Sequence, residues 1–422
     1  MITPDEFPYI KSLYVNDCYA YRDFNIELHD YKPFSHLILT GKNGSGKSTI
    51  LRAIHRQFFP TNVSIIGTAT NTTRTGDVVN VNKSVSLGSY SIPQVVISFL
   101  TIHKINNDTG GDRLMKPDEI FKHYRDKIYS HFEAKRDYSR QEIKGPSKEL
   151  DFAKSLNSED STKVFINNFK QYLVNKKIDQ AFAQIEQKTE FVANTERFFE
   201  VFRLKLSDMF EQDIKTIEFD RNNRYEFYLH LADGRKITFD MLPEGFSALL
   251  SMLMDLSMRV DLIRKQVNDY SYDPCGIVLI DEPETHLHLQ LQEQVLPLLT
   301  SLFPNVQFIA ATHSPAVIAS IKQATIFDLT TKESRDSEET AGRSYSDLMM
   351  SHFGLENEYS GLADEIIEKV DRAVAEFGDD PARLRAVLQP IYDENSAYLS
   401  PTLKVKFELL LAEREAKFVA HS

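Results

Sequence analysis

The sequence contains only two cysteines in 422 residues, Cys18 and Cys275, and they lie far apart in the chain. Two isolated cysteines form neither a disulfide framework nor the clustered ligands of a zinc site, so their number indicates a reducing compartment. No apolar run approaches the roughly eighteen residues that a membrane span needs, which argues against a transmembrane helix. The first residues lack the charged and apolar blocks of a signal peptide, and we therefore expect a cytoplasmic protein.

Positive charge is in deficit, with 49 lysines and arginines against 61 acidic residues. The formal net charge is −12 at pH 7, which argues against a surface that coats DNA indiscriminately but leaves a local basic groove open. Lysines and arginines gather in segment 112–148, and acidic residues gather in segment 356–395. A solvated helix face is the simpler interpretation of both segments. The hydrophobic fraction of 42% and the charged fraction of 26% are ordinary for a globular protein with a sizeable core.

A glycine-rich segment between a predicted strand and a predicted helix carries the most information. Residues 41–49 match the phosphate-binding pattern G-x-x-x-x-G-K-[ST] in full, and the apolar strand His36–Thr40 precedes them. Such glycines let backbone N–H groups turn around a phosphate, and the helix N-terminus adds its positive dipole end. We expect Lys47 to reach the β- and γ-phosphates of ATP and the Ser48 hydroxyl to hold Mg²⁺. The candidate ATP ligands are Gly41, Asn43, Gly44, Ser45, Gly46, Lys47, Ser48 and Thr49.

A second segment places two carboxylates at the end of a buried strand. The apolar run Gly276–Ile280 is followed directly by Asp281 and Glu282. Ligands of open α/β sheets bind at the carboxyl ends of the strands. We therefore expect Asp281 to hold Mg²⁺, directly or through water. Glu282 is the candidate catalytic base that polarises the attacking water, a role typically worth ~10²–10⁴ in rate.

A third segment places a histidine at the end of another apolar strand. Val306–Ala311 is followed by the run Thr312-His313-Ser314-Pro315. At this position His313 can contact the γ-phosphate and respond to its loss, whereas the simpler alternative is a turn histidine bonded to the backbone. The order and spacing of the three segments favour the catalytic role.

Together these segments resemble the ATP-binding-cassette heads of RecF/SMC-like ATPases. The resemblance is carried by the phosphate loop, by Asp281–His288 and by Ala311–Pro315. More narrowly, the chain resembles stand-alone ATPases of bacterial anti-phage defence, namely those of the Septu, retron and PARIS systems and the ATPase half of OLD-type nucleases. The resemblance covers about residues 1–100 and 214–330, and its motifs are specific for the superfamily rather than for one defence system.

The resemblance implies a head-to-head homodimer, or a higher homo-oligomer, with two ATP molecules between the subunits. The phosphate loop of one subunit would face the signature helix of the other, and Glu284–His288 would cross the dimer seam. The spacing of His286 and His288 is not the H-E-x-x-H pattern, so no zinc site is expected there.

The signature segment departs from the family pattern L-S-G-G-Q. Leu242–Leu250 occupies its place and keeps Gly245, whose N–H is a candidate phosphate ligand. Pro243 replaces the serine that would reach the γ-phosphate; a proline suits a helix start but supplies no donor, and Ser247 lies deeper. We therefore expect slow hydrolysis. Gln94 is a weak candidate for the Mg²⁺-sensing glutamine.

The expected fold is α/β: an ABC-type P-loop ATPase head with a mixed central sheet and an antiparallel subdomain, extended by helical regions. Strand-like patterns and the hairpin signal Asp233-Gly234 support the core, whereas the segment between its halves is charged, poor in glycine and helical in spacing. The expected domains are an N-terminal core lobe, a helical insertion, a C-terminal core lobe and a mostly helical C-terminal region, at 1–104, 105–213, 214–330 and 331–422.

Several functions are compatible with these motifs. The leading hypothesis is a cytoplasmic ATPase that senses infection or DNA and controls a separate nuclease or toxin, docked through the helical insertion or the acidic C-terminal helices. It rests on a short C-terminal region without the acidic pairs of a nuclease. The alternatives are a DNA-repair or DNA-tethering ATPase that uses the basic segment 112–148, and a scaffold that binds ATP without hydrolysing it. A transporter subunit is disfavoured by the degenerate signature, and we expect no membrane partner.

Overall fold

The computed structural model describes most of the chain: residues 1–59, 86–87, 90–91, 94–99, 104–106, 112–114, 116–124, 126–135, 143, 145–146, 161–210, 213–242, 244–353, 361–378 and 380–419. Two compact units form, Met1–Gly354 and Leu355–Ser422. No helix among the described residues is long and apolar enough to cross a bilayer.

The larger unit is built on a six-stranded sheet in the order β16-β15-β3-β14-β13-β9. Its strands are β3 (His36–Thr40), β9 (Ile128–Phe132), β13 (Gly276–Asp281), β14 (Val306–Ala311), β15 (Ala324–Asp328) and β16 (Glu333–Asp336). All neighbours pair in parallel except β15 and β16. The central strands β3 and β14 are buried along their whole length because both faces of a parallel sheet are covered. Since β14 lies between β3 and β13, the ends of all three strands meet at one edge.

A second, antiparallel sheet has the order β2-β1-β6. Its strands are β1 (Ile10–Asp17), β2 (Arg22–Glu27) and β6 (Gln94–Phe99). Helix α1 (Lys47–Phe58) begins directly after the phosphate loop and shares one buried core with this sheet and with β3. In that core Ile50 and Leu51 pack with Leu13, so the loop is fixed between two sheets.

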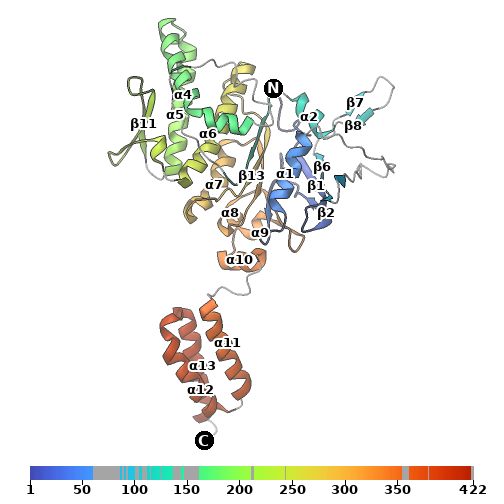
Figure 1. The fold of residues 1–422 in the computed structure, drawn as a ribbon, viewed down its shortest axis with the longest axis vertical. Coiled ribbons are helices and arrows are strands. Elements are labelled where there is room, and N and C mark those ends of the chain that lie inside the picture. Colours follow the sequence, from blue (N-terminus) through green and yellow to red (C-terminus); the bar gives the residue numbers. More distant parts are fainter. Residues whose placement is uncertain are drawn as a thin grey trace. The chain divides into compact units, whose positions relative to one another are not determined.

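Helices α4 (Ser161–Ile185), α5 (Thr189–Phe210) and α6 (Glu244–Val267) pack together, with α4 and α5 side by side (Figure 1). A buried ion pair in α6, Arg259 Nε to Asp255 Oδ2 at 2.8 Å, also bonds the Ser130 hydroxyl of β9 and so joins the helix to the sheet. A hairpin sheet precedes α6 and comprises β10 (Ile214–Asp220), β11 (Glu226–Leu231) and β12 (Lys236–Thr238). Its second turn holds Gly234 at φ 89°, as the Asp-Gly signal predicts.

Shorter elements complete the larger unit: β4 (Ser86–Leu87), β5 (Tyr90–Ser91), β7 (Lys104–Asn106), β8 (Asp112–Leu114), α2 (Pro117–His123), η1 (Phe239–Met241), α7 (Leu289–Leu302), α8 (Pro315–Ser320), α9 (Ser337–Thr340) and α10 (Tyr345–Phe353). The smaller unit contains α11 (Gly361–Phe377), α12 (Pro381–Asn395), η2 (Ser396–Tyr398) and α13 (Pro401–Val419). These helices enclose a core of their own, which includes Ile366, Leu384 and Leu403.

The expected α/β head with an antiparallel subdomain is confirmed by these two sheets. Two regions nevertheless differ in detail from their expected character. Segment 105–213 is not wholly helical, because β9 lies within it and pairs with β13 at the edge of the central sheet. The region after residue 330 is also divided, since β16, α9 and α10 belong to the larger unit. Strands β9 and β16 are short and partly polar, so neither carries the long apolar run that marks a central strand. The four domain limits themselves stay a proposal.

Candidate nucleotide-binding site

The glycines of residues 41–49 adopt the backbone that a phosphate cradle needs. Gly41 and Gly46 have φ of 128° and 97°, in the left-handed region that side chains rarely adopt. A Cβ on Gly46 would lie 2.8 Å from the carbonyl oxygen of Cys18, and one on Gly41 would lie 3.0 Å from Oγ1 of Thr330. The loop backbone is therefore in close contact with two segments that are distant in sequence, one at Cys18 and one at Thr330. Of the other candidate ligands, Asn43 and Gly44 are exposed and Ser45 is buried, while Thr49 lies half-buried in α1.

Lys47 is only 5% exposed and its ammonium turns into the loop. Nζ donates to the carbonyl oxygens of Gly41 at 2.9 Å and Lys42 at 3.2 Å. Burial lowers the pKa of Lys47 to about 8, although nearby carboxylates oppose that shift. Those carboxylates belong to Glu282, Asp281, Glu284 and Asp328. The lysine is therefore still mostly charged at pH 7 and is placed to attract a phosphate.

Ser48 and Asp281 meet although they are 233 positions apart. The Ser48 Oγ donates to Oδ1 of Asp281 at 2.9 Å, which joins the start of α1 to the end of β13. Hydroxyl and carboxylate oxygens are the hard ligands that Mg²⁺ prefers. The pair therefore fits the magnesium site that the sequence predicts, and the structure brings both predicted ligands to one place.

Glu282 leaves β13 in a left-handed turn. Its φ is 48°, an uncommon value for a residue with a side chain, and its N–H donates to the carbonyl oxygen of Ala311 at 2.8 Å. Strained backbone of this kind persists only where the surroundings fix it, and it concentrates at functional sites. The turn keeps the partly exposed Glu282 side chain at the sheet edge, beside Asp281 and close enough to Lys47 to oppose the fall in its pKa.

His313 follows β14 at the same edge. The ring is half-buried, and burial and then the charge of Lys47 lower its pKa, while Asp281 opposes them. The imidazole is therefore neutral at pH 7, and it lies within electrostatic reach of both the loop lysine and the first carboxylate. The structure thus brings residues from all three predicted segments together, namely Lys47, Ser48, Asp281, Glu282 and His313.

Glu284 is a residue of this site to which the sequence analysis gave no chemical role. Its Oε1 accepts hydrogen bonds from the Thr312 hydroxyl and from the His313 backbone N–H, both at 2.7 Å. Its Oε2 is buried and has no hydrogen-bond partner in the described part of the chain, and burial raises the pKa of this carboxyl. Glu284 therefore links the turn after β13 to the turn that carries His313. The sequence shows an acid after Pro283, but no local pattern reveals a contact across 29 positions.

The signature segment begins α6 beside the turn after β13. A Cβ on Gly245 would lie 2.2 Å from the carbonyl oxygen of His286, so the close approach of the two backbones already requires glycine. The contact between Gly245 and a nucleotide stays a prediction. Pro243 lies outside the described residues, as does the side chain of Gln94.

The predicted seam and the predicted basic groove stand differently. His286, His288 and Leu289 are exposed, the last by 52%, as a subunit contact would require. Much of the basic segment 112–148 lies outside the described residues. Within it, Lys127 is buried against the carbonyl oxygen of its own turn, so it does not face solvent.

A family model described as "AAA domain, putative AbiEii toxin, Type IV TA system" matches residues 90–319. This is more than half of the chain. The match includes Asp281, Glu282 and His313 but begins after the phosphate loop.

Several curated proteins are similar to parts of this chain. The Retron Vc95 probable ATPase of Vibrio cholerae serotype O1 biovar El Tor is 26% identical over 70% of this chain and 71% of its own. The Septu protein PtuA of Bacillus thuringiensis is 25% identical over 67% of this chain and 66% of its own. The Retron Ec83 probable ATPase of Escherichia coli is 28% identical, but this chain spans only 34% of it. An Smc head domain from Pyrococcus furiosus, solved with the C-terminal domain of ScpA, covers 79% of this chain and 98% of its own at 16% identity and a TM-score of 0.40. A likeness at that level supports no conclusion of its own.

Proposed function

Because the chain belongs to the family of AAA domains described as "putative AbiEii toxin, Type IV TA system", we propose that it binds ATP with Mg²⁺ and hydrolyses it slowly. The single observation that carries this proposal is the hydrogen bond between Ser48 and Asp281, which holds a phosphate-loop hydroxyl against the carboxylate of a separate strand. Neither residue has a local reason to meet the other. Coordination of the same magnesium ion would explain why the two side chains meet.

Each residue of the site has a definite part in this proposal. The amides of residues 41–49 and the Lys47 ammonium bind the phosphates, and Ser48 and Asp281 would hold the metal. Magnesium bound there would neutralise part of the negative charge of the phosphates. Glu282 accepts a proton from water at the strand end. His313, neutral at pH 7, donates a hydrogen bond toward the γ-phosphate.

We further propose that this ATPase acts in anti-phage defence and controls a separate effector, a nuclease or toxin. The names of the similar proteins support the setting, since two are retron ATPases and one is a Septu protein. The three-helix unit that follows residue 354 has its own hydrophobic core and is a candidate docking module for the effector. The exposed loop around His288 is the candidate contact in an ATP-bound homodimer.

The proposal is tested with purified protein and the variant Glu282→Gln. The wild type should bind Mg·ATP and release phosphate slowly, without cutting DNA. The variant should keep ATP affinity within about threefold but lose ~10²–10⁴ of the hydrolysis rate. A phage-infection assay is then made in cells that carry this gene together with the genes next to it. Loss of defence in the same variant favours a hydrolysis-driven switch, whereas full defence favours the scaffold alternative. Plasmid nicking by the protein alone, abolished in the variant, would refute control of a separate effector.

A further inference from the structure

A pocket lies at the other end of the strands that carry the candidate site. It encloses about 290 Å³ between α5, α6 and the segments that lead into β13 and β14. Pro274 precedes β13 and Phe303 precedes β14, whereas Asp281 and Thr312 stand at the opposite, carboxyl ends of the same strands. The pocket is therefore separate from the phosphate loop, although it shares two strands with it.

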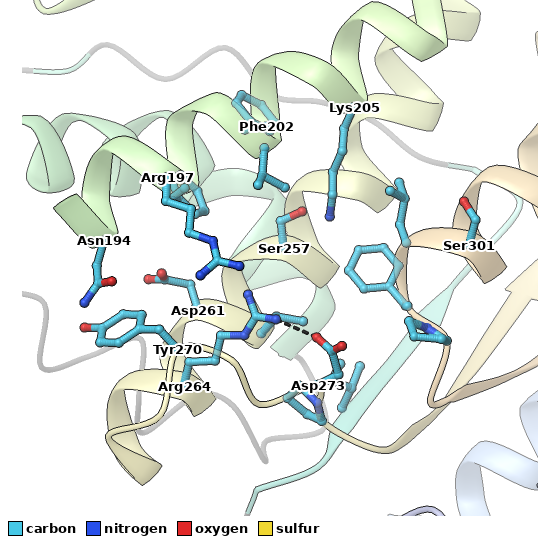
Figure 2. A pocket seen from close by; sticks show the side chains of 18 residues that line it. Asn194, Arg197, Phe202, Lys205, Ser257, Asp261, Arg264, Tyr270, Asp273 and Ser301 are labelled. Atoms are coloured by element: carbon cyan, nitrogen blue, oxygen red, sulfur yellow. Dashed lines mark hydrogen bonds and ion pairs between the residues drawn. The ribbon is translucent and has the colours of Figure 1, made fainter.

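Three cations from two helices converge on this pocket. Figure 2 shows Arg197 and Lys205 of α5 and Arg264 of α6 directed into it, with the two guanidinium groups turned toward each other. Like charges gathered in this way repel one another unless something of opposite sign lies between them. A convergent set of donors with a local excess of positive charge is the arrangement that binds an anion.

The two acids of the pocket do not neutralise this set. Asp261 is already bonded to Lys176 at 2.8 Å and to the Tyr172 hydroxyl. Asp273 pairs with Arg264 at 2.5 Å. Among the residues that the structure describes, Arg197 and Lys205 form no ion pair. The pocket therefore carries about two uncompensated positive charges, which is close to the charge of a phosphate monoester at pH 7.

Lys205 shows the effect of this surplus. Burial, and then the nearby charge of Arg264, lower its pKa to about 8, while Asp273 opposes both. Its Nζ lies 4.6 Å from the centre of the Phe303 ring, a cation–π contact that leaves the ammonium without a hydrogen-bond acceptor in the described chain. An anion in the pocket would provide that acceptor.

The remaining walls are apolar and aromatic. Phe202, Phe303, Leu302 and Val260 contribute to these walls. We propose that this pocket binds a small phosphomonoester, with the phosphate between Arg197, Lys205 and Arg264 and an apolar or aromatic body against Phe202 and Phe303. A cavity of this size, at the lower end of the range for ligand pockets, fits a mononucleotide better than a triphosphate.

The test is a calorimetric titration of the full-length protein with AMP. The phosphate loop is first saturated with a non-hydrolysable ATP analogue and Mg²⁺, so that only a second site is measured. We expect one AMP site per chain, at least tenfold weaker binding of adenosine, and affinity that falls as salt rises. A repeat in Lys47→Ala, without the analogue, should give the same AMP affinity, which keeps this result independent of the candidate ATP site.

Two substitutions identify the pocket. Arg197→Ala, at an exposed position that should not affect folding, and Lys205→Met, which keeps the stem and removes the charge, should each weaken AMP about tenfold to a hundredfold. Arg221→Ala, in the exposed turn between β10 and β11, is the matched control and should leave AMP binding unchanged. The absence of AMP binding at millimolar concentration, or binding that neither pocket substitution weakens, would overturn the proposal.

Discussion

Replacement of Glu284 tests how the site holds its histidine. The Glu284 carboxylate accepts two hydrogen bonds through one oxygen, from the Thr312 hydroxyl and from the His313 N–H. In Glu284→Ala both donors lose their acceptor, at a cost of about 1–3 kcal/mol each. Removal of a buried carboxyl, whose pKa is raised by burial, returns part of that cost. We therefore expect a decrease of about 1–4 kcal/mol in the free energy of unfolding.

The kinetic effect should be larger than the effect on binding. Glu284 makes no hydrogen bond to residues 41–49 among the described contacts, so the affinity for ATP should change less than threefold. His313 would no longer be held in place, and a shift of about 1 Å in such a group costs up to ~10² in rate. Single-turnover ATP hydrolysis in Glu284→Ala should accordingly fall about tenfold to a hundredfold.

The matched control is Glu284→Gln. The amide keeps an oxygen where Oε1 accepts both bonds, and its NH2 group replaces Oε2, which has no hydrogen-bond partner among the described residues. We expect this variant to retain most of the hydrolysis rate and stability. Equal losses in the alanine and glutamine variants would show that charge rather than the two hydrogen bonds matters. An unchanged rate in Glu284→Ala would refute the positioning role altogether.

Three further predictions concern other residues of the candidate site. In a double-mutant cycle of Ser48→Ala and Asp281→Asn, urea denaturation without Mg²⁺ should give a coupling of about 1–2 kcal/mol, and additive effects would mean that their hydrogen bond contributes nothing. Gly245→Ala would place a Cβ 2.2 Å from a backbone oxygen and should clearly lower the melting temperature. Gly342→Ala is the control, because a Cβ at that position meets open space and should leave the melting temperature unchanged. Equal melting temperatures of the two variants would contradict the close approach of the backbones at Gly245. The pKa of Lys47 is about 8 in the folded protein and 10.5 ordinarily, so between these pH values the folded protein has lost a proton that the unfolded chain keeps. The contribution of Lys47 to the free energy of unfolding therefore rises with pH across that window. The affinity for ATP falls over the same window, because the neutral amine attracts phosphate less. Calorimetry at about pH 9 in two buffers should detect proton uptake on ATP binding, and no uptake would show that Lys47 does not bind phosphate as an ammonium.

Local patterns were sufficient for much of the fold. The mainly apolar runs before residue 41 and before Asp281 predicted β3 and β13, because a strand buried on both faces is mainly apolar. The hairpin turn at Gly234 was also predicted correctly, since its signal lies within a few residues. Strand β9 was missed because Ser130 and His131 interrupt its apolar pattern, and only its pairing with β13 identifies it as part of the central sheet.

By itself, the sequence determined the candidate residues for triphosphate binding, since the loop pattern, the acids after one strand and the histidine after another are each local. Tertiary structure alone decided which of them meet: the Ser48–Asp281 bond, the support of His313 by Glu284 and the cation-lined pocket between α5 and α6 all join distant segments. The physical reason is that strand order and helix packing set the distances between such segments, and no short-range pattern encodes that order.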